Sequence, residues 1–110
     1  DNTATPVAPT SAAKELTYYI TLADDAVATL YAITSNAWLF VTVGTDVAER
    51  GIFIVDSTGT VTAVAATANM VLNADTDTKF CIGTAATQEP LQIKNRLGSS
   101  KPVLIKVIYN

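Results

Sequence analysis

The residues best suited to do chemistry in this sequence are two short acidic pairs. Asp75 and Asp77 stand two positions apart in a polar stretch, and Asp24 and Asp25 are adjacent. Carboxylates can act as nucleophiles, as general acids or bases, or as oxygen ligands of hard cations. The sequence contains no histidine, which removes the most frequent general base and the commonest zinc ligand. Any catalytic chemistry would therefore depend on these carboxylates.

Residues 75–78, with the sequence DTDT, follow the apolar residues 70–72 and resemble the Asp-x-Asp part of the Asp-x-Asp-x-Thr signature of phosphatases of the haloacid dehalogenase type, with Lys79 in the place of its threonine. The resemblance implies an aspartyl nucleophile beside Mg²⁺ at the end of a parallel strand. That chemistry needs a doubly wound sheet with crossover helices, which 110 helix-poor residues do not supply. We therefore expect residues 75–78 to form a turn, and we expect no catalytic residues and no enzyme activity.

The same acidic pairs also offer the oxygen ligands that Ca²⁺ prefers. A dedicated calcium site gathers several carboxylates and carbonyls, whereas Asp24-Asp25 and Asp75/Asp77 are separated by roughly fifty residues. The alternative is that these aspartates hydrogen-bond to the backbone of turns. We expect this second role, with no metal-binding and no cofactor-binding residues.

A carbohydrate-binding surface is a further option, because Trp38 could combine with Tyr18, Tyr19 or Tyr31. Trp38 opens the run 38–43, WLFVTV, which is rich in aromatic and β-branched residues and apolar on both faces. Such a run is typical of a central strand sandwiched between two layers. We therefore expect Trp38 to lie in the core.

A series of short strands must position all of these residues. Residues 16–22 alternate between apolar and polar positions, which is the period of a strand. Turns follow at intervals of about ten residues, among them 23–25, 56–59 and 98–100, and no amphipathic helix of ten residues appears. The sequence predicts strands over 16–22, 27–33, 38–43, 51–55, 60–65, 70–73, 79–83, 91–97 and 102–109.

This spacing of strands and turns predicts an all-β fold, a single antiparallel β-sandwich that is jelly-roll-like. We expect one such domain over residues 15–110. The single cysteine, Cys81, falls in the predicted strand 79–83 and should be a small buried hydrophobic residue. Residues 1–14 are rich in Pro, Thr, Ala and Ser, so we expect a flexible N-terminal arm, either a spare tail or a segment that orders on a neighbour.

The composition points toward contacts with other proteins. The chain is 49% hydrophobic and 15% charged, whereas soluble domains have about 25% charged residues. A neutral or apolar surface usually meets another protein, although Ala and Thr also raise the average. Residues 1–89 hold all ten acids, and residues 90–110 hold four bases and no acid. These opposite charges could attract neighbouring subunits to one another, or they could be ordinary charges on solvated strand faces. We expect no nucleic-acid partner and, without about 18 consecutive apolar residues, no membrane partner.

Residues 16–30, LTYYITLADDAVATL, and residues 95–104, NRLGSSKPVL, carry a resemblance to a family. The first stretch looks like the opening hairpin, and the second like the closing hairpin, of small virion proteins of tailed bacteriophages. These are capsid decoration (cement) proteins and the short β domains of head fibres. The scarcity of charge and the absence of histidine are similar to that class.

The resemblance implies a structural virion protein that stabilises coat (capsid) protein subunits through protein–protein contacts. It also implies a homo-oligomer, with a trimer favoured, on the outer capsid surface after assembly in the host cytoplasm. The family has no catalytic residues to carry over. The alternative is a carbohydrate- or receptor-binding module, lectin-like or at the tip of a fibre.

Overall fold

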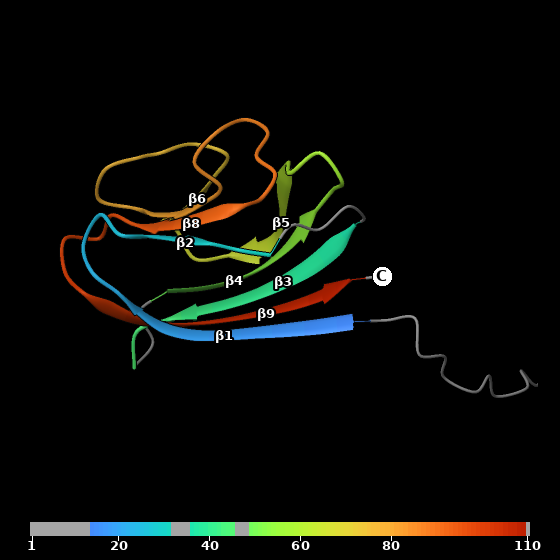
Figure 1. The fold of residues 1–110 in the computed structure, drawn as a ribbon. Coiled ribbons are helices and arrows are strands. Elements are labelled where there is room, and N and C mark those ends of the chain that lie inside the picture. Colours follow the sequence, from blue (N-terminus) through green and yellow to red (C-terminus); the bar gives the residue numbers. More distant parts are fainter. Residues whose placement is uncertain (1–13, 32–35, 46–48, 110) are drawn as a thin grey trace, which may run out of the picture.

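The computed structural model describes residues 14–31, 36–45 and 49–109, which fold into two packed sheets (Figure 1). The expected all-β sandwich is confirmed, and within these residues there is no helix, so none could cross a membrane. The strands are β1 (Lys14–Leu22), β2 (Val27–Thr29), β3 (Ala37–Val43), β4 (Glu49–Val55), β5 (Val61–Ala66), β6 (Met70–Leu72), β7 (Phe80–Ile82), β8 (Gln92–Asn95) and β9 (Lys101–Tyr109).

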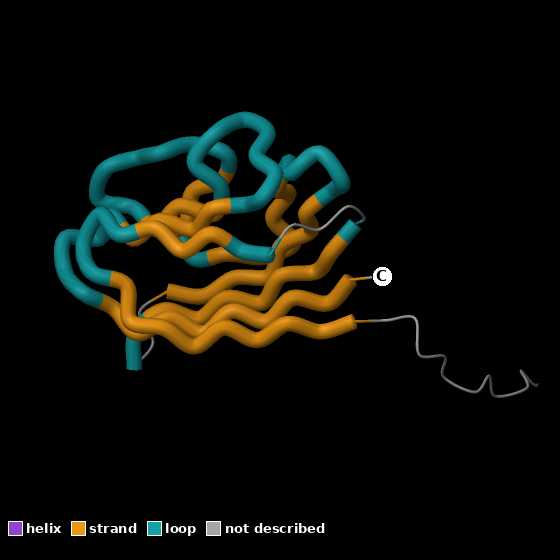
Figure 2. The backbone as a smooth tube through the Cα atoms, viewed as in Figure 1, coloured by secondary structure: helices purple, strands orange, loops and turns teal. Residues whose placement is uncertain are grey.

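The larger sheet has five antiparallel strands in the order β1-β9-β3-β4-β5 (Figures 1 and 2). Burial along β3 alternates strictly, with Leu39 and Val41 inaccessible and Trp38 and Phe40 exposed. This follows from the two-residue period of a strand, which sends successive side chains to opposite faces. One face of the larger sheet therefore meets the core, and the other faces solvent.

The smaller sheet has four strands in the order β2-β8-β7-β6, and its β6–β7 pair is parallel. The expectation of a wholly antiparallel sandwich is therefore wrong at this pair. Parallel neighbours normally need a crossover of a dozen or more residues. Here the strands have three residues each, so the chain must return only about 7–10 Å along them, and residues 73–79 are long enough to do so.

The first two strands pair with the last two. β1 pairs with β9 in the larger sheet, and β2 pairs with β8 in the smaller sheet. The chain crosses between the sheets four times, after β1, β2, β5 and β8. Neither residues 16–30 nor residues 95–104 form the hairpin that their resemblance suggested, because each stretch joins strands of different sheets.

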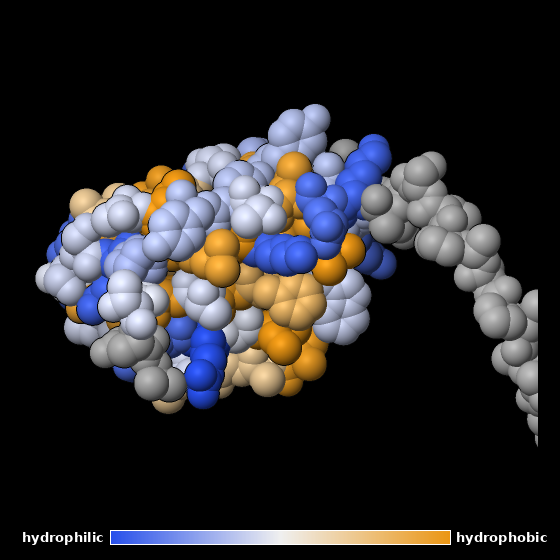
Figure 3. All heavy atoms as spheres, turned by 90° about the horizontal axis from the view of Figure 1, so that it is seen from below, coloured by the Kyte–Doolittle hydropathy of each residue, from blue (hydrophilic) through white to orange (hydrophobic). Residues whose placement is uncertain are grey.

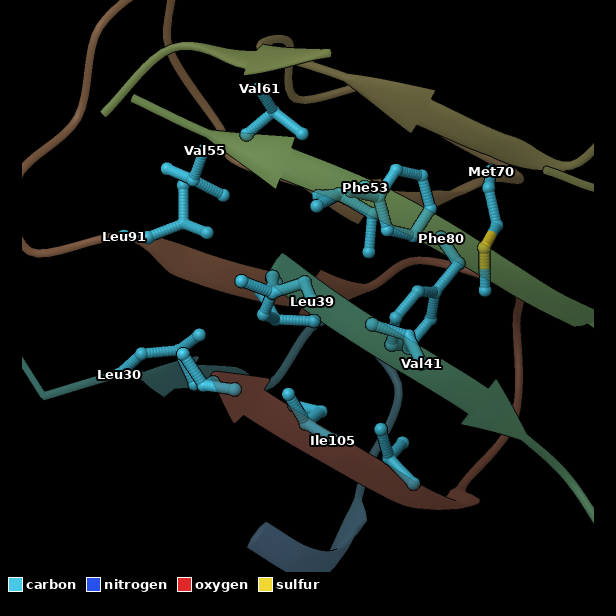
Figure 4. Close-up of a cluster of buried hydrophobic side chains, with 14 of the residues drawn as sticks. Leu30, Leu39, Val41, Phe53, Val55, Val61, Met70, Phe80, Leu91 and Ile105 are labelled. Carbon is cyan, nitrogen blue, oxygen red and sulfur yellow. The ribbon is translucent and has the colours of Figure 1, made fainter. Parts of the chain in front are cut away.

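Aliphatic and aromatic side chains from both sheets fill the space between them (Figure 4). Leu39, Phe53 and Ile105 of the larger sheet meet Phe80 and Ile93 of the smaller sheet, and all five are 0% exposed. Cys81 is also 0% exposed, which confirms its expected role as a small buried residue. Its Sγ donates to the carbonyl of Thr76 at 3.6 Å.

The turn predicted at residues 56–59 joins β4 to β5. Asp56 Oδ1 accepts hydrogen bonds from the backbone N–H groups of Thr58 and Thr60, at 2.9 and 3.0 Å, and from the Thr58 hydroxyl at 2.6 Å. Gly59 has a φ of 83°, and a Cβ there would lie 1.9 Å from the carbonyl oxygen of Gln88. The turn therefore needs both its aspartate and its glycine.

Several strand boundaries differ from the prediction. β1 begins at Lys14, inside the segment expected to be an arm, and the rest of that arm, residues 1–13, lies outside the described residues. β2 ends at Thr29 rather than at residue 33, and residues 32–35 are also outside the description. β8 spans Gln92–Asn95 rather than 91–97. The last strand, β9, has β1 on one side and β3 on the other.

Candidate protein-interaction surface

Three of the four aspartates in the two acidic pairs, Asp25, Asp75 and Asp77, meet at one guanidinium group. Arg96 Nε lies 3.2 Å from Asp25 Oδ1, Nη1 lies 2.9 Å from Asp75 Oδ1, and Nη2 lies 3.5 Å from Asp77 Oδ1. Lys94 Nζ lies 2.9 Å from the other oxygen of Asp75. The carboxylates thus converge on protein cations. No set of three potential metal-ligating side chains was found among the described residues.

The cations also set the protonation of Asp75. The hydrogen bond from Lys94, and then that from Arg96, hold the pKa of Asp75 below its ordinary value of 3.8. An ionised carboxylate tied at both oxygens is suited to fixing the loop between β6 and β7 onto β8. The DTDT motif therefore lies in a loop, with a turn at residues 77–78, that ion pairs anchor, although Asp75 does follow a parallel strand, as the phosphatase signature requires.

Asn95 joins two of the four sheet crossings, those after β1 and after β8, from inside the protein. It is 0% exposed and the only buried polar side chain of the described residues. Its Nδ2 donates to the carbonyls of Leu22 at 2.9 Å and of Ser99 at 2.8 Å, and its Oδ1 accepts from the N–H of Leu97 at 3.0 Å. Residues 16–30 and 95–104 therefore meet at this joint.

Trp38 does not lie in the core. It points away from the smaller sheet and is 45% exposed, so the expectation of a buried tryptophan is wrong. β3 is central within its sheet, as expected, but the fold has two layers and covers only one face of it. Tyr19 is 73% exposed on the same side, whereas Tyr18 faces inward and its hydroxyl accepts from the N–H of Tyr31 at 2.9 Å.

We call the solvent side of β1, β9, β3 and β4 the outer face. Strand register and burial place on it the side chains of Glu15, Thr17, Tyr19, Trp38, Phe40, Thr42, Arg50, Ile52, Ile54, Leu104, Lys106 and Ile108. Phe40 is 37% and Leu104 41% exposed. Figure 3, which views the molecule from the side of the larger sheet, shows hydrophobic residues gathered in the middle of this face.

The outer face is hollowed beside β5. A groove of ≈ 420 Å³ runs over Phe40, Ile52 and Ala65, with Arg50 at its border. It forms where the pairing of β4 with β5 shifts by a bulge between Ile52 and Phe53, because a bulge bends its strand and increases the twist. A smaller hollow of ≈ 240 Å³ adjoins Trp38. Apolar side chains line most of the larger hollow.

Charges on the outer face are few and mostly positive. Lys106 pairs with Glu15 at 3.2 Å, and Arg50 makes no ion pair with any residue that the structure describes. Three of the four bases in residues 90–110, namely Lys94, Arg96 and Lys106, pair with acids of the same chain. The expected attraction between a basic segment and an acidic neighbour is therefore largely satisfied inside the chain.

Sequence reasoning missed the outer face because an apolar strand has two explanations. The run 38–43 was interpreted as a strand covered on both sides, which would make Trp38 and Phe40 part of the core. Strands of three to nine residues forming two layers can cover each sheet on one face only. The available signal was the number of layers. Two layers cover only one face of β3, yet apolar residues lie on both of its faces. Comparison with protein-family models, with curated proteins and with solved structures found no match.

Proposed function

We propose that this chain is a structural assembly protein that docks on other proteins through the outer face of its larger sheet. The partner that the resemblance of residues 16–30 and 95–104 implies is the coat protein of a tailed bacteriophage, with this chain as a decoration protein on the outer capsid surface. The chain adds contact area at joints between coat subunits and contributes no reaction.

The observation that carries the proposal is an apolar outer face that the fold itself leaves uncovered. Tyr19, Trp38, Phe40 and Leu104 are between 37% and 73% exposed. Isolated surface hydrophobic residues are ordinary, but a contiguous apolar patch on a small domain marks an interface. Aromatic side chains with one arginine at the border form the composition that interface centres favour.

The size of the outer face fits this use. Four strands spaced about 4.8 Å apart, each followed for about seven residues of 3.3 Å, give a flat area of roughly 440 Å². The accessible surface of side chains on that area is larger. A standard interface removes about 800 Å² from each partner. One outer face is therefore of the right order to hold one partner surface.

The test is co-sedimentation with shells assembled from the coat protein encoded in the same genome. The wild-type chain is expected to sediment with the shells. Phe40→Lys and Leu104→Lys each place a charge in the middle of the outer face, and we expect either change to reduce bound protein at least tenfold.

Val27→Lys is the matched control. Val27 is 42% exposed, close to the values of Phe40 and Leu104, but it lies on β2 in the other sheet. This variant should bind like the wild type. Equal losses in all three variants, or binding that survives both outer-face changes, would overturn the proposal that the outer face is the docking surface.

The exposure of Trp38 keeps the second candidate function open. An exposed tryptophan beside Phe40 on a flat sheet can stack on a sugar ring, so a carbohydrate- or receptor-binding module is the alternative. It predicts binding on a glycan array that Trp38→Ala abolishes and Val27→Lys leaves unchanged. An array without signal, with and without Ca²⁺, would remove this candidate.

A further inference from the structure

The edge strands of the two sheets differ in how they are protected from pairing with another chain. β2 and β6 have three residues each, and β5 has a bulge in its pairing with β4. β1 has nine residues, pairs with β9 in unbroken register and contains no proline. Its two charged residues, Lys14 and Glu15, are at its first two positions. Shortness, bulges, prolines and charges along the strand protect sheet edges, and the central part of β1 has none of these.

The backbone of β1 presents unpaired groups to its free side. The N–H of Gly44 donates to the carbonyl of Pro102 at 2.8 Å, so Pro102 faces β3. Hydrogen-bonded pairs alternate along an antiparallel ladder, so Val103 faces β1, opposite Ile20. The odd-numbered residues of β1 therefore direct N–H and C=O away from β9. These are Glu15, Thr17, Tyr19 and Thr21, and in the described part of the chain no strand pairs with them.

A second copy of β1 fits this edge in one register. In an antiparallel pair centred on Tyr18, Glu15 lies opposite Thr21 of the second copy, and Thr17 lies opposite its Tyr19. Each of these pairs can exchange two hydrogen bonds, and two-fold symmetry repeats them. An axis at Thr17 would place Thr21 opposite a residue outside β1, and an axis at Tyr19 would do the same to Glu15. Only the axis at Tyr18 uses every outward-facing residue.

The side chains agree with the same register. Leu16 lies opposite Ile20 of the second copy on the inner side, and both are partly buried against the core and have surface left to cover. Lys14 lies opposite Leu22, so no charge meets a like charge. Like charges directly opposite each other would destabilise such a pair, whereas apolar pairs stabilise it. We propose that two copies of this chain associate by antiparallel pairing of their β1 strands about a two-fold axis at Tyr18.

This pairing goes beyond the proposed function because it uses an edge and not the outer face. A two-fold axis normal to the sheet makes one continuous sheet of ten strands, in which both outer faces lie on the same side. The docking area available to a partner is thereby doubled. The pairing closes with two copies and predicts a dimer rather than the trimer that the family resemblance implies.

A cysteine at the axis tests the register directly. In the proposed pair, Tyr18 of one copy lies directly opposite Tyr18 of the second copy. This is a non-hydrogen-bonded pair, in which the two Cα atoms are about 4.5 Å apart. That separation lies in the range of disulfides. The variant Tyr18→Cys should form a covalent dimer on mild oxidation, detected on a non-reducing gel. The native Cys81 is fully buried, so the wild type should give no such dimer.

Ile20→Cys is the matched control, on the same strand and the same side. In the proposed pairing, residue 20 of one copy lies four residues, about 13 Å along the strand, from residue 20 of the other copy. A disulfide cannot bridge that distance. We expect no covalent dimer from it. Equal crosslinking of Tyr18→Cys and Ile20→Cys, or no crosslinking of Tyr18→Cys, would overturn the register.

Thr17→Pro tests the pairing without a crosslink. Its N–H faces the free edge, so proline there removes no bond to β9 but blocks the second copy. Sedimentation velocity over a wide dilution series should show a dimer for the wild type and a monomer for the variant, with equal circular dichroism. A wild type that stays monomeric throughout would refute the inference. Because no coat protein is present, that result would not bear on the docking function of the outer face.

Discussion

Along β3, the two faces of the larger sheet both carry apolar side chains but have opposite surroundings. On β3, Leu39 and Val41 are at most 1% exposed, whereas Trp38 and Phe40, their neighbours in sequence, are 45% and 37% exposed. The inner face is covered by the smaller sheet, and no described element covers the outer face. Apolar residues on the inner face therefore stabilise the fold, and we propose that those on the outer face serve contact with another molecule.

This difference separates two free-energy gains from apolar burial, one on folding and one on association. The hydrophobic composition alone does not distinguish them. Burial of an apolar side chain gains about 25 cal/mol for each Å² removed from water. The inner face gains that free energy on folding, whereas the outer face gains it only on association. Substitutions at adjacent positions of β3 should therefore affect different equilibria, and this expectation can be tested in order of effect.

The largest effect is expected on the inner face. Leu39→Ala leaves a cavity between the sheets at a position with 0% exposure. It should lower the free energy of unfolding by about 3 kcal/mol, within the range of about 2–5 kcal/mol for buried leucines. Urea unfolding followed by circular dichroism measures this value. A loss below about 1 kcal/mol would show that the inner face is not the core we describe.

The joint at Asn95 should come next. Asn95→Leu leaves the carbonyls of Leu22 and Ser99 and the N–H of Leu97 without their side-chain partner. We expect a loss of about 2 kcal/mol, because buried polar groups left without partners are destabilising. Asn69→Leu is the surface control and should change the free energy by about 0.5 kcal/mol or less. Similar losses for both would contradict the role of the buried amide.

Phe40→Lys should have little effect on folding, although it is expected to abolish docking. Its side chain is already partly in water, and a lysine stem can cover the same neighbours. The free energy of unfolding should change by about 0.5 kcal/mol or less, measured as for Leu39→Ala. A loss as large as that of Leu39→Ala would mean that the outer face stabilises the isolated fold, and the comparison of the two faces would fail.

Acid should weaken the fold slightly through the loop anchors. The pKa of Asp75 is lowered by its hydrogen bonds to Lys94 and Arg96, and that of Asp56 by its bonds to Thr58 and Thr60. A carboxyl whose pKa is lower in the folded protein contributes stability. This contribution is fully present when the pH is above the ordinary pKa of 3.8, and it is lost as the pH falls through the lowered pKa of the folded protein. The effect is small because both groups are exposed.

Urea midpoints at pH 7 and below pH 3.8 check this acid dependence. The midpoint of the wild type should fall over this interval, and that of Asp75→Asn, which has lost one of the titrating anchors, should fall less. An identical fall in both proteins would show that the ion pairs with Lys94 and Arg96 do not contribute to the pH dependence.

Most of the strand pattern could be predicted from the sequence, because local alternation and turn residues fix it. The strand at residues 16–22 and the turn at Asp56 are examples. Pairing between distant segments could not be predicted, because alternation fixes which side chains share a face and not which strand lies alongside. The pairing of β1 with β9 and the parallel β6–β7 pair are therefore results of the structure.

The sequence predicted contact with another protein, but it did not predict which residues form the candidate surface. The low content of charge indicated contact with another protein, and this stays a prediction about function. Its residues were not identified, because Trp38 and Phe40 were interpreted as core. Conversely, the meeting of Asp25 and Asp75 at Arg96 depends on two loops that only the fold brings together.

Trp38 provides the most direct test, because it is the only tryptophan and lies on the outer face. Its fluorescence quenching by acrylamide can be measured for the chain alone and for the chain bound to coat-protein shells. If the outer face is the docking surface, binding should lower the quenching constant severalfold and shift the emission to shorter wavelength. Quenching that is unchanged while the chain sediments with the shells would place the contact elsewhere and contradict the account.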